Sequence, residues 1–270
     1  MAAELEDWAR TFDEVFSTPA STVADEVWAD VYGDEYPAGL EIYSFTSRSE
    51  LRLIAEWLAI PRVGGALVDI GCGRGGPGLW VAGATGARLT AIDIAASALE
   101  SARAQAVRLG LADRAGFQLG SFEATGLPDG FADAIMSVDA LLFTPHKEAA
   151  LRELARIARP GARLVVTTWD FDGQPSNRPP QVSDHRDIAH DAGFDVIAYN
   201  DTPHWREYQR AITARLLQRT SDLAAESGES PEQVREGILE MEATMALQRR
   251  RVLMVAQRAD GQVGTQHLHH

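Results

Sequence analysis

The sequence VDIGCGRGG, residues 68–76, decides the fold of this 270-residue chain. It overlaps the run ALVDI (66–70), whose near-continuous hydrophobicity is typical of a strand buried in a parallel sheet. Gly71, Gly73 and Gly76 follow the spacing G-x-G-x-x-G. Pro77 suits the first position of a helix. The segment therefore predicts a strand, a glycine-rich turn and a helix, a combination shared by several classes of cofactor-binding protein.

Strands and helices alternate along the chain after this turn. Further strands are expected at 87–94, 115–120, 131–138, 162–169 and 194–200, and a last one at 250–258. Because helices separate these strands, the pattern predicts βαβ units and a doubly wound α/β fold with a parallel sheet. Ser97 and Glu100 predict a capping box for the helix after the second strand, and Ser183 is expected to cap a short helix that stops at Gly193.

The segments outside this alternation suggest additional parts. Helical patterns near 4–16 and 48–59 are joined by an aromatic stretch, 28–45, that is too rich in Gly and Pro for a helix. Two more helical stretches, near 204–226 and 231–248, form an insertion before the last strand. We expect a lid segment (1–60), a cofactor-binding core (61–200), a helical cap (201–249), the last core strand (250–260) and a tail that resembles an affinity tag (261–270).

Composition excludes several classes of protein. The chain has 25 Lys and Arg against 39 Asp and Glu, a net charge of −14, which disfavours binding to the phosphates of nucleic acids. No apolar run reaches the roughly 18 residues of a membrane span, and the acidic start MAAELEDWAR is unlike a secretory signal. A single Cys suits a reducing compartment. We expect a cytoplasmic protein whose partner is a small molecule, with no metal; a homodimer is compatible with the sequence.

Two carboxylates indicate the class of cofactor. A pyrophosphate binds at a helix N-terminus because the amides and the helix dipole attract negative charge, and Asp69, in the preceding strand, would repel it. S-adenosylmethionine has no phosphate, and it carries a sulfonium and an ammonium group that Asp69 can favour. Asp93 lies about 20 residues after the glycine turn, the spacing expected of a carboxylate that binds ribose hydroxyls.

Residues 64–169 resemble the class I S-adenosylmethionine-dependent methyltransferases, most closely those of ubiquinone, menaquinone and natural-product biosynthesis. The resemblance rests on VDIGCGRGG, AIDI, GSFEATGLPDGFADAIMSVDAL and ALRELARIARPGARLVVTTW. It implies a Rossmann-like, seven-stranded, mostly parallel sheet whose last strand is antiparallel. It also implies that Asp69, Gly71 and Gly73 surround the methionine part of the cofactor, and that Asp93 holds the ribose.

The same resemblance places other residues around the cofactor. It implies Ile94 on the adenine, Ser121 and Phe122 at the adenine edge, and Ser137 and Val138 near the methionine amino group. The chain departs from the family at Ser121, where an Asp usually accepts a hydrogen bond from the adenine amino group. It departs again at 142–143, where many relatives have histidine and this chain has Leu and Phe.

Candidates for catalysis are few, which suits methyl transfer. An in-line displacement at a carbon activated by sulfonium mainly needs positioning, and a base is needed only if the nucleophile must lose a proton. His185, after the loop that follows the fifth strand, and His204, at the start of the cap, are the candidate bases. Arg48 is a candidate partner of the methionine carboxylate.

Aromatic residues provide the candidate substrate contacts. Tyr43 belongs to the aromatic stretch that could close over the sulfonium, because aromatic faces attract cations. Trp205 and Tyr208 begin an apolar stripe in the cap that is expected to roof the pocket.

The leading hypothesis is transfer of a methyl group to an O, N or C atom of a small, largely apolar metabolite. Two alternatives remain open: a cyclase or isomerase that retains the cofactor, and a binding protein that senses it.

Overall fold

The computed structural model describes residues 2–259, with a seven-stranded sheet of order β3-β2-β1-β4-β5-β7-β6 at its centre. The strands are β1 (Ala66–Ile70), β2 (Arg88–Asp93), β3 (Ala115–Leu119), β4 (Ala132–Val138), β5 (Ala158–Phe171), β6 (Phe194–Asp201) and β7 (Gln248–Arg258). β7 is antiparallel to both neighbours, β5 and β6, and the other pairs are parallel. The expected Rossmann-like sheet is confirmed, including the antiparallel last strand.

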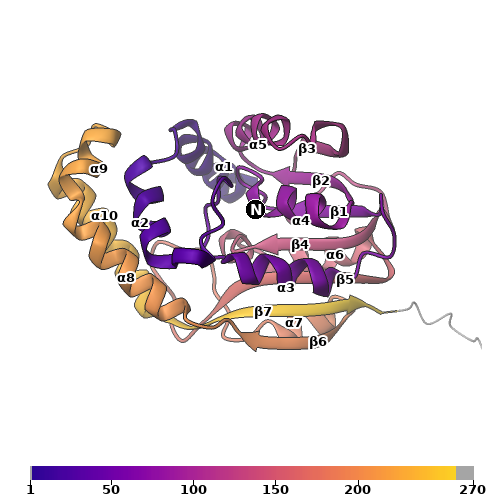
Figure 1. Ribbon diagram of the computed structural model, residues 1–270. Helices are drawn as coiled ribbons and strands as arrows, with labels where there is room; N and C mark the ends of the chain where they lie inside the picture. The colour runs from indigo at the N-terminus through magenta and orange to yellow at the C-terminus, as the bar shows by residue number, and fades with distance from the viewer. Residues whose placement is uncertain (1, 260–270) are drawn as a thin grey trace, which may run out of the picture.

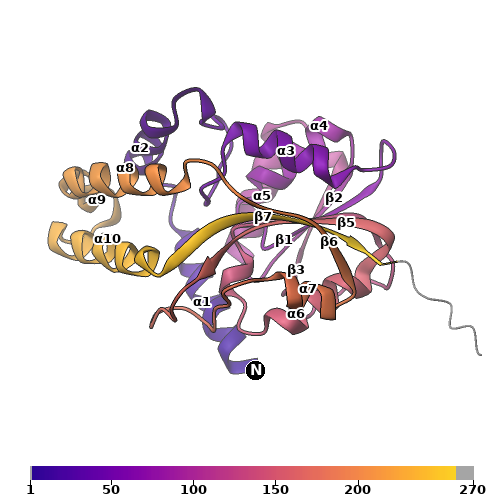
Figure 2. The same cartoon turned by 90° about the horizontal axis from the view of Figure 1, so that it is seen from below.

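Helices cover both faces of this sheet, as Figures 1 and 2 show. On one face lie α3 (Arg48–Leu58), α4 (Gly76–Thr85) and α5 (Ala96–Arg108), and on the other lie α6 (Lys147–Ile157) and α7 (Arg186–Asp191). Short 3-10 turns cover Gly33–Glu35, Ala112–Arg114 and Leu141–Phe143. Because both faces are covered, the central strands β1 and β4 are buried along nearly their whole length, as the run at 66–70 predicted.

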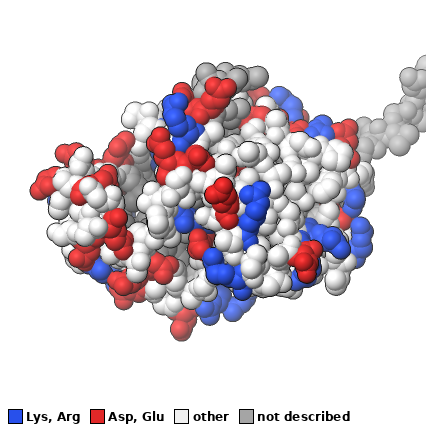
Figure 3. Space-filling view, turned by 90° about the horizontal axis from the view of Figure 1, so that it is seen from above, with Lys and Arg blue, Asp and Glu red and all other residues white. Residues whose placement is uncertain are grey.

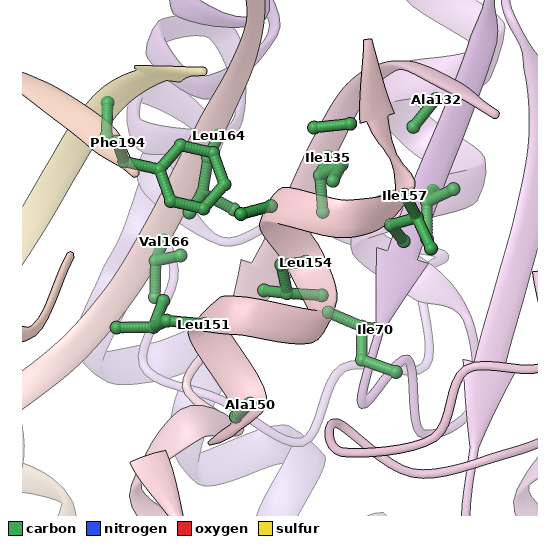
Figure 4. Packing of buried hydrophobic residues seen from close by; sticks show 14 of the residues in the cluster. Ile70, Ala132, Ile135, Ala150, Leu151, Leu154, Ile157, Leu164, Val166 and Phe194 are labelled. Carbon is green, nitrogen blue, oxygen red and sulfur yellow. The ribbon is translucent and has the colours of Figure 1, made fainter. Parts of the chain in front are cut away.

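Neighbouring residues of one strand pack into different cores. Leu67 contributes to the cluster beneath α3, α4 and α5, whereas Val68 and Ile70 contribute to the cluster beneath α6. Figure 4 shows the second cluster, in which Leu151 and Leu154 of α6 face the strands. The two cores fix the sheet, and with it the loops at its carboxyl edge.

The remaining helices gather beyond the carboxyl ends of the parallel strands (Figure 1). They are α1 (Ala2–Ser17) and α2 (Thr22–Tyr32) of the N-terminal region, and α8 (Trp205–Gln218), α9 (Thr220–Ser227) and α10 (Pro231–Ala246) of the insertion. Val27 and Tyr32 of α2 form one apolar cluster with Ile212 and Leu216 of α8 and Ile238 of α10. On the face drawn in Figure 3, acidic side chains gather over this helical end.

Several local expectations were wrong. Ser97 is not a cap: α5 begins at Ala96, and the Ser97 backbone N–H and hydroxyl donate to Asp13 of α1 instead. Ser183 is not a cap either, since His185 occupies the N-cap position of α7. The N-terminal aromatic stretch does contain helix, because α2 reaches Tyr32 before Gly33 ends it.

No helix among residues 2–259 is both long and apolar enough to cross a bilayer. The expected tag-like tail, 261–270, lies outside the described residues.

Candidate active site

The glycine turn after β1 is the centre of the site. Gly71, Gly73 and Gly75 have φ angles of +70°, +51° and +82°, a region that favours glycine. A Cβ atom on Gly71 would lie 2.4 Å from the Cβ of Ala140, so this turn also passes too close to the next loop for any side chain. The carbonyl of Ile92 accepts the N–H of Gly71 at 2.8 Å and thereby ties the turn to β2.

Asp69 is buried beneath this turn and is 1% exposed. A Cβ atom on Gly78 would lie 2.4 Å from its Oδ2, so α4 can pack over the carboxylate only because that position is glycine. Burial, reinforced by the nearby charge of Asp93, raises the pKa of Asp69 to about 7. Its Oδ2 has no hydrogen-bond partner in the described part of the chain, so the site holds an acceptor ready for a donor.

Asp93 is fixed at the end of β2. Its Oδ2 accepts the N–H of Gly73 at 2.7 Å, and its Oδ1 accepts the N–H of Ala95 at 3.0 Å. Burial raises the pKa of Asp93, and the amide donors from Ala95, Gly73 and Ile94 oppose that shift. The carboxylate therefore bridges the glycine turn and the start of α5.

These groups line an open pocket that encloses about 870 Å³ including its mouth. The expected cofactor residues that line it are Asp69, Gly71, Gly73, Asp93, Ile94, Ser121, Phe122 and Val138. Ser137 and Arg48 do not line it. Ser137 is fully buried behind its wall, and Arg48 donates to the carbonyl of Tyr36 at 3.1 Å. Arg74, which sequence reasoning did not single out, lines the pocket and pairs with Glu41.

Ser121 stands where the family usually has Asp, and Glu123 provides a carboxylate close by. The Ser121 hydroxyl oxygen accepts the backbone N–H groups of Glu123 and Ala124, at 3.2 Å and 3.1 Å, and so closes its own turn. Glu123 also lines the pocket. Its Oε1 accepts the Thr144 hydroxyl, and its Oε2 is buried with no partner in the part of the chain that the structure describes. A second unused acceptor therefore lies at the end of the pocket where adenine is implied. An acid two residues after the expected one was the only sequence signal.

A second, larger pocket adjoins the first and encloses about 1590 Å³ including its mouth. Residues that line both pockets are Phe16, Glu41, Tyr43, Ser44, Arg74, Asp139 and Phe143. The rest of its wall is mainly apolar and comes from the N-terminal region, the turn at 141–143, β5 and the insertion. Tyr43 thus lies where a substrate contact was expected, at the junction of the two pockets.

The insertion reaches this pocket through α10 rather than through α8. Met241 and Met245 line the pocket, whereas neither Trp205 nor Tyr208 does. Trp205 is buried in one apolar cluster with Trp169 and Phe171, and Tyr208 stacks on Tyr32 with ring centroids 4.1 Å apart. The two substrate residues expected in the insertion therefore do not face the cavity, unlike Tyr43.

The two candidate bases also lie elsewhere. His185 is fully buried, with Nδ1 3.0 Å from Oδ1 of Asp170, and burial lowers its pKa. His204 is exposed beside Glu207. No His or Lys among residues 2–259 lines either pocket.

Asp139 occupies the junction with all its acceptors engaged. It has a φ of +54°, and its oxygens accept from Arg251, from the Thr167 hydroxyl at 2.8 Å and from the N–H of Phe45 at 3.0 Å. Arg251 is 1% exposed and also pairs with Glu50 at 2.7 Å. This network joins the lid segment, α3, β4 and β7, and leaves Asp139 unavailable as a free base.

Comparisons with known proteins agree with this geometry. Residues 68–166 match the family described as Methyltransferase domain. The chain is 30% identical to 27-O-demethylrifamycin SV methyltransferase of Amycolatopsis mediterranei (strain S699), over 69% of this chain and 67% of that protein. It is 34% identical to a probable chloroplastic tocopherol O-methyltransferase of Oryza sativa subsp. japonica, over 53% of this chain and 43% of the relative. The chain thus spans less than half of that relative's length.

The fold comparison gives the same result over more of the chain. The crystal structure of the cyclase SpnF superposes with a TM-score of 0.71 at 20% identity, covering 94% of this chain and 95% of that one. At this identity the likeness shows the fold alone. Taken with the sequence relatives, the chain belongs to the class I S-adenosylmethionine-dependent methyltransferase family.

Proposed function

We propose that this protein transfers the methyl group of S-adenosylmethionine to an O, N or C atom of a small, largely apolar molecule. One observation carries the proposal: the glycine-turn pocket, which contains the unpartnered Asp69 oxygen, adjoins the larger apolar pocket along a shared wall. A cofactor and an acceptor bound in these two pockets would meet at that wall.

The residues of the first pocket fit the family's cofactor. Asp69 Oδ2 would accept from the ammonium of the methionine part, and the Asp93 carboxylate would bind the ribose hydroxyls. Glu123 Oε2 would accept from the adenine amino group, in place of the Asp that the family usually has at position 121. Ile94 and Phe122 supply apolar surface for the ring.

Positioning would provide most of the catalysis. Bound S-adenosylmethionine supplies a methyl carbon activated by a positively charged sulfur. Phe16, Phe143 and the more exposed Tyr43 stand at the junction, where aromatic faces attract that charge. Holding two reactants in line contributes roughly 7–11 kcal/mol toward the barrier.

The small number of candidate general bases at the junction limits the kinds of acceptor atom that could react. Asp139 and Glu41, the carboxylates at the junction, are both engaged with arginines. The nucleophile therefore needs to be reactive without a protein base, as an ionised oxygen or an electron-rich carbon is.

Partner and location follow from the same features. The net charge of −14 and the two pockets support a small-molecule partner rather than nucleic acid. The single Cys supports the cytoplasm. Nothing in the site favours ring closure or sensing over methyl transfer.

The test combines binding with transfer. Calorimetry should show that adenosylhomocysteine binds and that NAD does not, and Asp93→Ala should weaken binding by about 1.5–3 kcal/mol because the ribose loses a charged acceptor. Asp113→Ala, which removes the same charge from an exposed turn outside both pockets, is the matched control. With methyl-labelled cofactor and a panel of apolar acceptors, the label should appear in an acceptor. Tight NAD binding without adenosylhomocysteine binding would refute the proposal, and product without label would favour the cyclase alternative.

A further inference from the structure

The large pocket contains one arginine whose charge is not matched. Its two cationic wall residues are Arg74 and Arg178, and Arg74 pairs with Glu41 at 3.4 Å. Arg178 has no carboxylate oxygen within 4.0 Å anywhere in residues 2–259 whose side chains are described. A partly buried cation without an anion costs free energy, so such groups in proteins are generally paired.

The geometry of Arg178 leaves part of its guanidinium unused. It lies in the segment between β5 and α7, and its Nη1 donates to the neighbouring carbonyl of Asn177 at 2.9 Å. Its Cζ lies 5.2 Å from the centroid of the Phe143 ring, which lines both pockets. Its Nε is buried and has no hydrogen-bond partner among the described residues. Burial lowers the pKa of Arg178, opposed by Tyr43 and Glu240, which agrees with a cation short of stabilising partners.

Arg178 also marks the entrance of the pocket. It lines the large pocket and, together with Tyr43 and Met241, an outer groove that is more open to solvent. A molecule whose apolar body fills the pocket would therefore leave one end beside this guanidinium. The acidic side chains gathered over the helical end (Figure 3) give an anion no general attraction, so its binding depends on a specific cation.

We propose that Arg178 binds an anionic oxygen, a carboxylate or an ionised acidic hydroxyl, at one end of an otherwise apolar acceptor. This rests on the proposed function, because it takes the large pocket as the acceptor site. A guanidinium offers a planar pair of N–H donors to such a group. The resulting charge-assisted hydrogen bonds are stronger beside an apolar wall, because less water competes for them. An acceptor that carries its own negative charge also agrees with the lack of His and Lys in the pocket walls of the described chain.

The pocket's size and wall narrow this class. The cavity volume is about 380 Å³, within the 300–1,000 Å³ of common ligand sites, and the wall includes Trp28, Phe45, Trp169 and Met245. Because this wall is mainly apolar, polycyclic and long-chain acids suit it better than amino acids do.

The test compares 1-pyrenebutyric acid and 1-pyrenebutanol, two probes with the same ring and chain length that end in a carboxylate and an uncharged hydroxyl. Both are titrated by pyrene fluorescence in the presence of saturating adenosylhomocysteine, which keeps them out of the cofactor pocket. The unaltered protein should bind the acid about tenfold more tightly than the alcohol, since one charge-assisted hydrogen bond is worth at least that factor. Arg178→Gln should remove the difference and leave affinity for the alcohol within about twofold.

Two control variants keep the result specific. Arg178→Lys should retain part of the preference for the acid, because it keeps the charge but loses the paired donors. Arg235→Gln removes one charge from an exposed position of α10 and should change nothing. Equal binding of the two probes by the unaltered protein would overturn the proposal, as would a preference that survives in Arg178→Gln. If Arg178→Gln fails to fold, the acid preference of the unaltered protein and of Arg178→Lys still tests the proposal.

The proposed function is measured separately in the same samples. Calorimetry with adenosylhomocysteine alone reports the cofactor site and does not depend on Arg178. Loss of that binding with the acid preference intact would refute the cofactor assignment and not the role of Arg178. The reverse result would refute only the role of Arg178.

Discussion

At the scale of single residues, the site contains carboxylate oxygens that the protein itself leaves unsatisfied. Oδ2 of Asp69 and Oε2 of Glu123 are both buried and both lack a hydrogen-bond partner in the described chain, and the two residues line the first pocket. An unsatisfied buried acceptor costs about 1–3 kcal/mol, so its retention here indicates a ligand donor at each point.

The first prediction concerns Asp69 and pH. Its pKa of about 7 in the free protein should fall when a ligand ammonium binds beside it, so binding releases a proton below pH 7. Affinity for adenosylhomocysteine should therefore weaken as pH falls below about 7, approaching tenfold per unit. Calorimetry between about pH 5.5 and 8 measures this. Asp69→Asn should flatten the profile, and an unaltered protein whose affinity is constant over the range would contradict the prediction.

The second prediction concerns Glu123 and adenine. S-inosylhomocysteine has a carbonyl oxygen on C6 of the base where adenosylhomocysteine has an amino group, so a carboxylate acceptor should reject it. We expect the unaltered protein to prefer adenosylhomocysteine by at least tenfold, and Glu123→Gln, which can also donate, to lose most of that preference. Glu148→Gln, on the exposed surface of α6, is the control. A preference that is the same in Glu123→Gln would show that another group reads the amino position.

Sequence reasoning found the residues whose roles follow from spacing and missed those whose roles follow from packing. Asp69, Gly71 and Asp93 stand at fixed distances from a strand end, so the motif alone brings them to the pocket. Glu123 and Arg178 matter only because neighbours far away in sequence leave part of each unpartnered. His185 looked like a candidate base because it follows a loop near the sheet edge, yet Asp170 and Tyr199 enclose it.

At the scale of elements, the unit formed by β1, the glycine turn and α4 was predictable almost to the residue. Its strand was recognised from an apolar run, its turn from glycine spacing and its helix start from Pro77. The starts of helices that lack such a motif were predicted less accurately. Ser97 has the sequence of a cap, but α1 of the N-terminal region takes its hydrogen bonds.

The third prediction tests whether the glycine turn needs space as well as backbone freedom. Gly71→Ala forces a side chain to a φ of +70° and places its Cβ 2.4 Å from that of Ala140. Gly110→Ala meets a similar φ of +67° with nothing within 4 Å. Gly110→Ala should lower the free energy of unfolding by about 1–2 kcal/mol and leave cofactor binding unchanged.

Gly71→Ala should cost more than Gly110→Ala, and it should weaken adenosylhomocysteine binding at least tenfold. Urea unfolding and calorimetry on the two variants measure both quantities. Equal effects of the two substitutions would mean that only backbone strain matters at the turn.

At the scale of the whole molecule, the acceptor pocket exists because chain segments far apart in sequence meet over the sheet edge. The N-terminal region supplies one side, α10 of the insertion supplies another, and the turn at 141–143 supplies the floor between them. Sequence predicted that both segments would roof the pocket. It could not predict which helix faces the cavity, because α8 and α10 carry similar apolar stripes and only their packing on α2 distinguishes them.

The last prediction concerns the ion network that holds these segments together. Arg251 of β7 donates to Asp139 at the end of β4 with two bonds of 3.1 Å, and to Glu50 of α3 at 2.7 Å. Burial alone would lower the pKa of Arg251, but the two carboxylates raise it overall, so the guanidinium stays charged. Arg251→Met would leave two buried carboxylates without their cation, which should lower the free energy of unfolding by about 3–5 kcal/mol.

An exposed pair provides the comparison for Arg251. Arg215 pairs with Asp30 at 2.7 Å, but its side chain is 42% exposed, so Arg215→Met should cost less than about 1 kcal/mol. Denaturant unfolding followed by tryptophan fluorescence measures both variants. Trp169, whose ring centroid lies 5.4 Å from the Arg251 guanidinium, reports on the network directly. A loss below about 1 kcal/mol in Arg251→Met would show that water replaces the cation. In that case the network would not be what fixes Asp139, and with it Phe45, at the junction of the two pockets.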